Sequence, residues 1–316
     1  MGLRVKSFVF FLCMASSTAY AFIYEISVLR RWNGQLGAYQ YFVGLSDFHD
    51  RSNPINKVQL KDFSEILDRC GSHSLKVGSE DISSPNNGRN AKCGRFYVQA
   101  RGGVLSGFGL QCKKRNLDVS NMEYRYCRVA ALGPVLNNAS NDMSRFPSVK
   151  NTRVIAIIRE IEEMFREIFL YRDGSLLTEF YNACIERVKR RMYELKLHTH
   201  SILMVSDYLD LISTVENRVD VLKKLLTFDS ILVDLKLLHD VLNSYNKTSY
   251  LAVAGGAHIT RVSKLLSKLG WQWVYTTTPT FVKEKNMSKC LGGHIIEGTF
   301  CKKPKPIDIR LIGNYL

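Results

Sequence analysis

Acidic residues are scarce in this sequence, and no apolar run in it is long enough to cross a bilayer. The 316 residues include 29 aspartates and glutamates against 44 lysines and arginines, which gives a formal net charge of +15. The basic residues are scattered, and neither an aromatic-interleaved RNA-binding motif nor a helix-turn-helix signature accompanies them. We therefore expect a basic, solvated surface and no specific nucleic-acid partner.

Two common site motifs are missing as well. None of the eight cysteines belongs to a CxxC pair, which argues against a structural zinc site. The glycines at 102–109 do not form a G-x-G-x-x-G turn directly after a strand, which argues against a dinucleotide-binding turn. Hydrophobic residues nevertheless make up 46% of the chain and charged residues 23%, so a globular core can form.

The first 21 residues have the pattern of a signal peptide. Two basic residues precede a short apolar run at 8–15, and Ala19-Tyr20-Ala21 offers a small-x-small cleavage site. We predict cleavage after Ala21 and export, periplasmic or secreted, with no transmembrane span left in the mature chain. An uncleaved anchor is the alternative.

Export would place the remaining cysteines in an oxidising compartment, where some of them should pair. Cys290 and Cys301 flank a glycine-rich loop and are the best candidate pair. Cys93 could pair with either Cys112 or Cys127. The odd number of remaining cysteines leaves at least one thiol free or intermolecular.

Alternating strand and helix patterns predict an α/β fold, with a mixed, largely parallel sheet, flanking helices and an inserted helical cap. The first strands, at 22–29 and 39–43, predict a hairpin. Further elements are predicted as helices at 57–69, 154–170, 176–197, 201–214, 216–226 and 229–244, and as strands at 74–77, 273–281 and 307–312. We divide the chain after residue 21 into 22–144, the N-terminal part of the core with a cysteine-containing insert; 145–227, the helical cap; and 228–316, the C-terminal part of the core.

The stretch 249–271 carries the strongest functional signal. Residues 250–254 form a short apolar run, typical of a strand that is buried on both faces. Gly255 and Gly256 allow a tight turn, and helical spacing begins at residue 260. His258 follows the end of the strand, where ligands bind in open α/β sheets. The alternative is a turn histidine bonded to nearby backbone.

Polar residues follow two earlier strands. Asp47 and His49 come after the second strand and could hold a metal or orient a base, although a capped turn would use the same residue types. Glu80 follows the third strand, where a solvated turn carboxylate is the alternative. Asp234 falls inside the apolar face of a helix, where a carboxylate needs a partner or a function. His239 lies on a more polar flank of that helix and is expected to be solvated.

Three of these stretches together resemble one superfamily. AVAGGAHITRVSKLLSKLGW, residues 252–271, resembles the late strand, glycine–histidine turn and helix of the TraB, ChaN-like and erythromycin-esterase-like superfamily. FVGLSDFHDR, residues 42–51, resembles its early strand–turn–histidine motif, and the strand ending at Glu80 resembles its early acidic motif. The early motif reads GLSDFH in place of the compact GxxH, and the cysteine-bearing insert at 83–148 has no counterpart in the family.

The resemblance implies a cleft in which the early and late histidines meet. It implies His49 as a general base or metal ligand, Glu80 as a residue that orients a water or binds metal, and His258 as the second base or ligand. Members of the superfamily include hydrolases, proposed metalloproteases and haem- or iron-related binding proteins.

Three functions are compatible with these patterns. The first is an exported hydrolase, with or without a divalent metal, in which water between His49, Glu80 and His258 attacks an ester or amide. The second is an exported protein that binds a small molecule, a peptide or a metal in the same cleft without turnover. The third is an interaction protein whose histidines stabilise turns. Further cleft candidates are Asp47, Asp234, Gly255 and Gly256, and the candidate metal ligands are His49 and His258.

Overall fold

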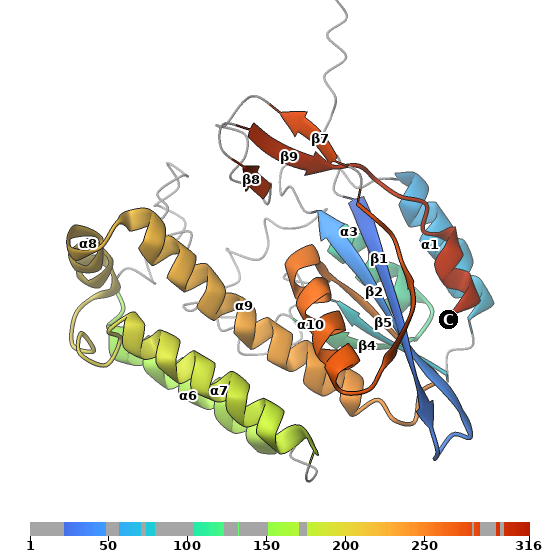
Figure 1. The fold of residues 1–316 in the computed structure, drawn as a ribbon, viewed down its shortest axis with the longest axis horizontal. Helices are drawn as coiled ribbons and strands as arrows, with labels where there is room; N and C mark the ends of the chain where they lie inside the picture. The colour runs from blue at the N-terminus through green and yellow to red at the C-terminus, as the bar shows by residue number, and fades with distance from the viewer. Residues whose placement is uncertain are drawn as a thin grey trace, which may run out of the picture.

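The computed structural model describes the chain in separate stretches, which are residues 22–48, 57–70, 74–79, 104–122, 132, 151–170, 176–279, 281–284, 295–297 and 300–316. Figure 1 shows them as a twisted sheet with helices on both faces, beside a group of long helices. The predicted signal peptide, the two predicted site residues His49 and Glu80, and three of the cysteines in the predicted pairs, Cys93, Cys127 and Cys290, lie outside the described residues.

The main sheet of the described chain has six strands in the order β4-β3-β5-β2-β1-β6. Their bounds are β1 (Phe22–Asn33), β2 (Ala38–Phe48), β3 (Leu75–Ser79), β4 (Asp118–Asn121), β5 (Ser249–Gly255) and β6 (Gln272–Thr276). Strands β2, β5, β3 and β4 run parallel to one another, whereas β1 pairs antiparallel with β2 and β6. The predicted α/β class, with a mixed and largely parallel sheet, is confirmed.

Both strands of the predicted hairpin are longer than the sequence pattern indicates. Strand β1 continues to Asn33, and β2 continues to Phe48 instead of ending at residue 43. Strand β2 stays extended because β5 pairs with it as far as Asp47, which lies opposite Gly255. The prediction that Asp47 follows the end of this strand is therefore wrong, because the residue is part of a central strand.

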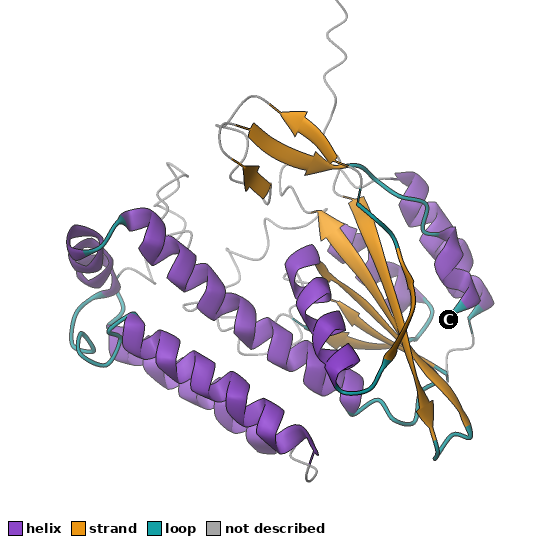
Figure 2. Cartoon of the chain, viewed as in Figure 1, coloured by secondary structure: helices purple, strands orange, loops and turns teal. Residues whose placement is uncertain are grey.

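Helices cover both faces of the main sheet (Figure 2). One face packs against α1 (Lys57–Arg69), α3 (Val104–Lys114) and the 3-10 helix η4 (Arg310–Asn314). The other face packs against α10 (Gly256–Lys268) and the C-terminal half of α9 (Arg218–Leu242). Side chains of β5 alternate between the two cores, so burial on both faces explains the apolar run at 250–254.

A third apolar core lies among the long helices, which are α6 (Val154–Leu170), α7 (Leu176–Glu194), α8 (Val205–Val215) and the N-terminal half of α9. The sequence pattern predicts two helices, at 216–226 and 229–244, where the structure has the single helix α9. This prediction is wrong because Thr227 and Ser230 are accommodated on the less buried side of a continuous helix.

Helix α9 is buried on most of its surface because its two halves belong to different cores. His239, which the sequence pattern predicts to be solvated, is only 8% exposed, and its Nε2 lies 2.7 Å from the Asn243 side-chain nitrogen. The prediction fails because even the more polar flank of this helix faces other parts of the protein.

A buried carboxylate joins α9 to three strands of the sheet. Asp240 accepts hydrogen bonds from Ser120 of β4 and, at 2.7 Å, from the hydroxyl of Tyr250 in β5. Its other oxygen lies 3.2 Å from the Lys76 amine of β3. A Cβ at Gly78 would lie 2.1 Å from the Tyr250 hydroxyl oxygen, so glycine is needed where this ring crosses β3.

The C-terminal segment forms a separate small sheet and then returns to the main one. Strands β7 (Phe281–Glu284), β8 (Ile295–Glu297) and β9 (Phe300–Pro304) pair antiparallel in the order β7-β9-β8. The strand predicted at 273–281 is wrong, because Pro279 separates β6 from β7. The strand predicted at 307–312 is also wrong. Ile309 and Ile312 are three residues apart and both buried, which suits the three-residue turn of η4.

Three cysteines in the described stretches, Cys70, Cys112 and Cys184, are free thiols. Cys112, which is buried in the core beneath α1 and α3, is one of these free thiols, so the suggested pairing of Cys93 with Cys112 is wrong. Cys93, Cys127 and Cys290 lie outside the described ranges, so the pairings of Cys93 with Cys127 and of Cys290 with Cys301 stay predictions. Across those ranges, no helix combines the length and the apolar character that a membrane crossing requires.

Candidate functional site

The turn from β5 into α10 is the centre of the candidate site. Gly255 ends β5 and is the N-cap residue of α10, and Gly256 begins the helix. A Cβ at Gly256 would lie 1.7 Å from the hydroxyl oxygen of Tyr24, so a larger residue here would have to displace this tyrosine. Because Gly255 ends β5, the turn lies at the carboxyl ends of the parallel strands, which is where open α/β sheets bind ligands.

His258 lies in the first turn of α10 and contacts α9. Its Nδ1 lies 2.7 Å from Oδ1 of Asp234. A carboxylate can only accept hydrogen bonds, so Nδ1 donates and the neutral ring keeps its acceptor lone pair on Nε2. The two side chains are 10% and 9% exposed. The structure therefore brings together two of the predicted cleft residues, Asp234 and His258, at the interface of α9 and α10.

Arg261 joins the same cluster from the next turn of α10. Its Nε lies 2.5 Å from Oδ2 of Asp234, and one terminal nitrogen lies 3.1 Å from Oδ1. The same nitrogen lies 3.2 Å from Nδ1 of His258. The histidine and the arginine together bond both carboxylate oxygens, which explains how an aspartate is accommodated in an apolar helix face. We call Asp234, His258 and Arg261 the Asp–His–Arg cluster.

A second polar group lies at the same end of the sheet, on β1 and β2. The Ser46 hydroxyl donates a 3.1 Å hydrogen bond to the carboxylate of Glu25. Burial raises the pKa of Glu25, and the bond from Ser46 opposes part of this rise. Burial and the neighbouring carboxylates of Glu25 and Asp47 raise the pKa of Tyr24 to about 12. Tyr24 therefore remains a neutral phenol, able to donate a hydrogen bond, at neutral pH.

Asp47 does not join the Asp–His–Arg cluster. Side chains alternate along β2, so Asp47 lies on the same face as Leu45, whose side chain belongs to the core under α1 and α3. Asp234 and His258 lie on the opposite side of the sheet, between α9 and α10. Asp47 is 3% exposed and acts on the site through the electrostatics of Tyr24.

The described residues do not fit a metal site. Within them, no group of three or more histidine, cysteine, aspartate and glutamate side chains is arranged to hold an ion. At His258, the Arg261 nitrogen 3.2 Å from Nδ1 would place a positive charge beside any bound cation. His49, the other predicted metal ligand, lies outside the described ranges, and so does Glu80.

The Asp–His–Arg cluster has an opening to one side. Asp234 and Arg261 line a hollow of about 450 Å³, whose walls come from α7, α9, α10 and β6. A molecule in this hollow would contact the carboxylate and the guanidinium directly. The hollow therefore gives access to Asp234 and Arg261, whereas His258 is not among the described residues that line it.

No family model, curated protein sequence or solved structure matches this chain. The resemblance to the TraB, ChaN-like and erythromycin-esterase-like superfamily therefore stays a prediction from its motifs. What can be inferred about function rests on the residues and contacts of the chain itself.

Proposed function

We propose that the chain is an exported hydrolase of the TraB, ChaN-like and erythromycin-esterase-like type, which acts on an ester or amide with His258 as general base. One observation carries this proposal, the 2.7 Å hydrogen bond between Asp234 Oδ1 and His258 Nδ1. A carboxylate on one ring nitrogen fixes the tautomer and the orientation of the imidazole. The other nitrogen can then accept a proton from water.

In the proposed reaction, His258 Nε2 takes a proton from a water molecule as the water oxygen attacks the carbonyl carbon. The Asp234 carboxylate stabilises the imidazolium that forms, and the imidazolium returns the proton to the leaving oxygen or nitrogen. Arg261 is a positioning residue, because it bonds both oxygens of Asp234. His49 and Glu80 are the residues that the resemblance adds to this site.

The test is turnover of p-nitrophenyl esters and p-nitroanilides by the purified chain and its variants. We expect His258→Gln to lower kcat by about 100-fold or more, the usual contribution of a general base. Asp234→Asn should lower kcat with a smaller change in KM, because an amide no longer enforces the tautomer. His198→Gln, which changes an exposed histidine, is the matched control. A His258→Gln variant with wild-type kcat would contradict the proposal.

A second candidate is an interaction protein in which His258 stabilises the fold. The enclosure of His258 favours it, because a side chain 10% exposed and bonded to α9 also stabilises the helix interface. This candidate predicts a lower melting temperature for His258→Gln and no turnover of any substrate by the wild-type chain. The hydrolase proposal predicts measurable wild-type turnover, so the same set of assays separates the two.

A further inference from the structure

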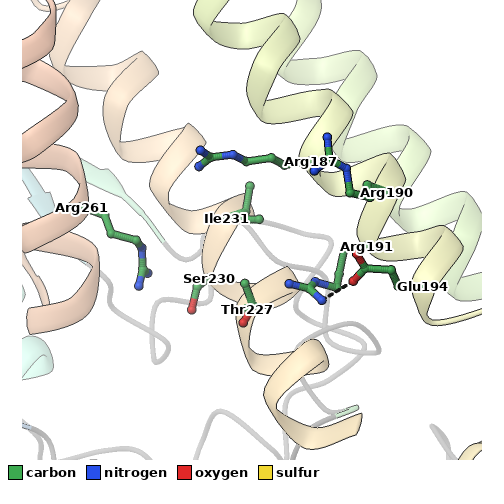
Figure 3. A pocket seen from close by; sticks show the side chains of 8 residues that line it. All are labelled: Arg187, Arg190, Arg191, Glu194, Thr227, Ser230, Ile231 and Arg261. Carbon is green, nitrogen blue, oxygen red and sulfur yellow. Dashed lines mark hydrogen bonds and ion pairs between the residues drawn. The ribbon is translucent and has the colours of Figure 1, made fainter. Parts of the chain in front are cut away.

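A groove lies between α7 and α10, with residues of α9 along its floor (Figure 3). Two hollows, of about 460 Å³ and about 450 Å³, share the lining residues Arg187, Ile231 and Arg261, so they lie side by side. We call the two together the arginine groove. It is defined by Arg187, Arg190 and Arg191 of α7 and by Arg261 of α10.

Positive charge in the arginine groove exceeds negative charge. Two of its four arginines pair with acidic residues of the groove itself, Arg191 with Glu194 and Arg261 with Asp234. Within the described stretches, no carboxylate forms an ion pair with Arg187 or Arg190, and Figure 3 shows both side chains away from Glu194. The groove therefore retains positive charge that its own walls do not neutralise.

The three α7 arginines are placed at a cost to the helix. Residues 187, 190 and 191 are three and four positions apart, so they share one face of α7, where like charges repel and weaken the helix. A solvated helix face would more often mix charges of both signs. The second wall repeats the pattern, because α10 contributes Lys264 and Lys268 beside Arg261. Gathered cations on two facing walls indicate an anionic ligand between them.

Phosphate fits this arrangement better than a simple monovalent ion. The planar guanidinium presents parallel N–H donors that match two oxygens of one phosphate group. In Figure 3, Arg187 extends from α7 and Arg261 from α10, with Ser230 of α9 between the two walls. Both walls and the floor of the groove therefore supply hydrogen-bond donors.

The end of the groove away from Arg190 is more apolar. Ile231, Leu235 and Leu265 line it, and Trp273 of β6 lines it with 45% of its surface exposed. An exposed indole ring beside aliphatic side chains offers a surface for an aromatic or apolar group. The volumes of the hollows fall in the range of small-molecule sites, about 300–1,000 Å³.

We propose that the arginine groove binds an organic phosphate, with the phosphate between Arg187, Arg190 and Arg261 and the organic group against Trp273. The proposal can be tested apart from the proposed hydrolase, because its variants change Arg187, Arg190 and Trp273, which the His258 chemistry does not use; Arg261 is common to both sites. A soluble phosphate monoester and the headgroup of an anionic phospholipid share this chemistry.

The test is calorimetric titration of the full chain with 1-naphthyl phosphate, 1-naphthol and inorganic phosphate. We expect 1-naphthyl phosphate to bind about tenfold more tightly than either partial ligand, because only it uses both ends of the groove. Arg187→Gln/Arg190→Gln should weaken its binding about tenfold or more, since charge-assisted hydrogen bonds are lost. Trp273→Ala should weaken the binding of 1-naphthyl phosphate but leave the binding of inorganic phosphate unchanged.

Arg159→Gln on α6 is the control, because it removes one exposed arginine from a helix that does not line the groove. If Arg159→Gln and the double variant weaken the binding of 1-naphthyl phosphate equally, the attraction is a diffuse surface effect and the proposal is overturned. Undiminished binding by a folded double variant would also overturn it.

A vesicle assay distinguishes the two sources of the phosphate. Sedimentation of the chain with phosphatidic-acid vesicles, reversed by 1-naphthyl phosphate, would support a lipid headgroup as the source. Binding of 1-naphthyl phosphate without sedimentation would support a soluble ligand. These binding measurements do not depend on turnover.

Discussion

Two aspartates of α9 are almost fully buried, but their partners differ in kind. Asp234 is bonded to a histidine and an arginine beside an open groove. Asp240 is bonded to two lysines and two hydroxyl groups inside the core. The first arrangement can take part in proton transfer, whereas the second holds the helix against the sheet.

The Asp240 network predicts a specific loss of stability at low pH. Burial by itself raises the pKa of Asp240, but Lys236 and Lys76 and two hydrogen bonds outweigh it, so the pKa lies below its usual value. The folded carboxyl group then binds its proton less tightly than the unfolded one. This stabilisation is complete above about pH 4 and is lost as the pH falls below that value.

We expect Asp240→Asn to lower the free energy of unfolding by about 3 kcal/mol at pH 7, because it leaves buried lysine charge without its partner. The variant should also lose less stability than the wild type between pH 5 and pH 3. Urea unfolding at both pH values checks this, with the exposed Asp210→Asn on α8 as a control expected to change stability by less than about 0.5 kcal/mol. Equal effects of the two substitutions would contradict the role given to Asp240.

Some residues of the candidate site can be predicted from the sequence, and there are physical reasons why the others cannot. Asp234 and His258 are visible because an acid in an apolar helix face and a histidine after a glycine turn are unusual. Arg261 could have been found from its spacing, since it lies three residues after His258 on one helix face. Tyr24 and Glu25 carry no such signal, because a register shift between Ile23 and Glu25 changes which side chains face the site.

At the scale of elements, helix α9 is the connection between the sheet and the other long helices. Leu232 is fully buried in the core among the long helices. Leu238 is fully buried in the core between the main sheet and helices α9 and α10. Because one continuous helix carries both side chains, we expect a disturbance of one core to affect the other. We therefore expect the two cores to unfold in one transition.

Leu232→Ala tests this coupling. The substitution should lower the free energy of unfolding by about 2–5 kcal/mol, because it leaves a cavity in the helical core. Tryptophan fluorescence reports on the sheet, where Trp271 is buried, while far-UV circular dichroism reports on all helices. We expect both signals to shift to the same lower urea concentration. A shift in circular dichroism alone would show that the cores unfold independently, and Lys223→Ala on the exposed side of α9 is the control.

Element type was easier to predict than element length. The apolar run at 250–254 identifies β5 because burial on both faces removes polar residues from a strand. The ends of β2 and α9 could not be read in the same way, because each is extended by a distant partner. Strand β2 continues as far as β5 pairs with it, and α9 continues through Thr227 because both of its halves are packed.

At the scale of the whole molecule, two buried thiol groups should make the stability of the fold sensitive to high pH. Burial raises the pKa of Cys112 to about 12 and that of Cys184 to about 11. The folded thiols hold their protons more tightly than unfolded thiols do. Their contribution to stability is complete below about pH 9 and is lost as the pH rises through these values.

We expect the free energy of unfolding to fall between pH 8.5 and pH 10.5, by about 2 kcal/mol for each of the two thiols. Urea unfolding under reducing conditions at these pH values measures the change. A Cys112→Ala/Cys184→Ala variant should show a shallower dependence on pH, whatever its stability at pH 8.5. An identical slope in the variant and the wild type would mean that other groups cause the alkaline loss.

The place of β5 between β2 and β3 has a consequence for biosynthesis. A nascent polypeptide that has just completed α9 already contains both neighbours, but the ribosome has not yet made the strand that separates them. Until residues 249–255 emerge, β2 and β3 each present an open edge that could recruit another chain. A stop codon before this point would therefore leave a product prone to aggregate, even though most of the polypeptide had been translated.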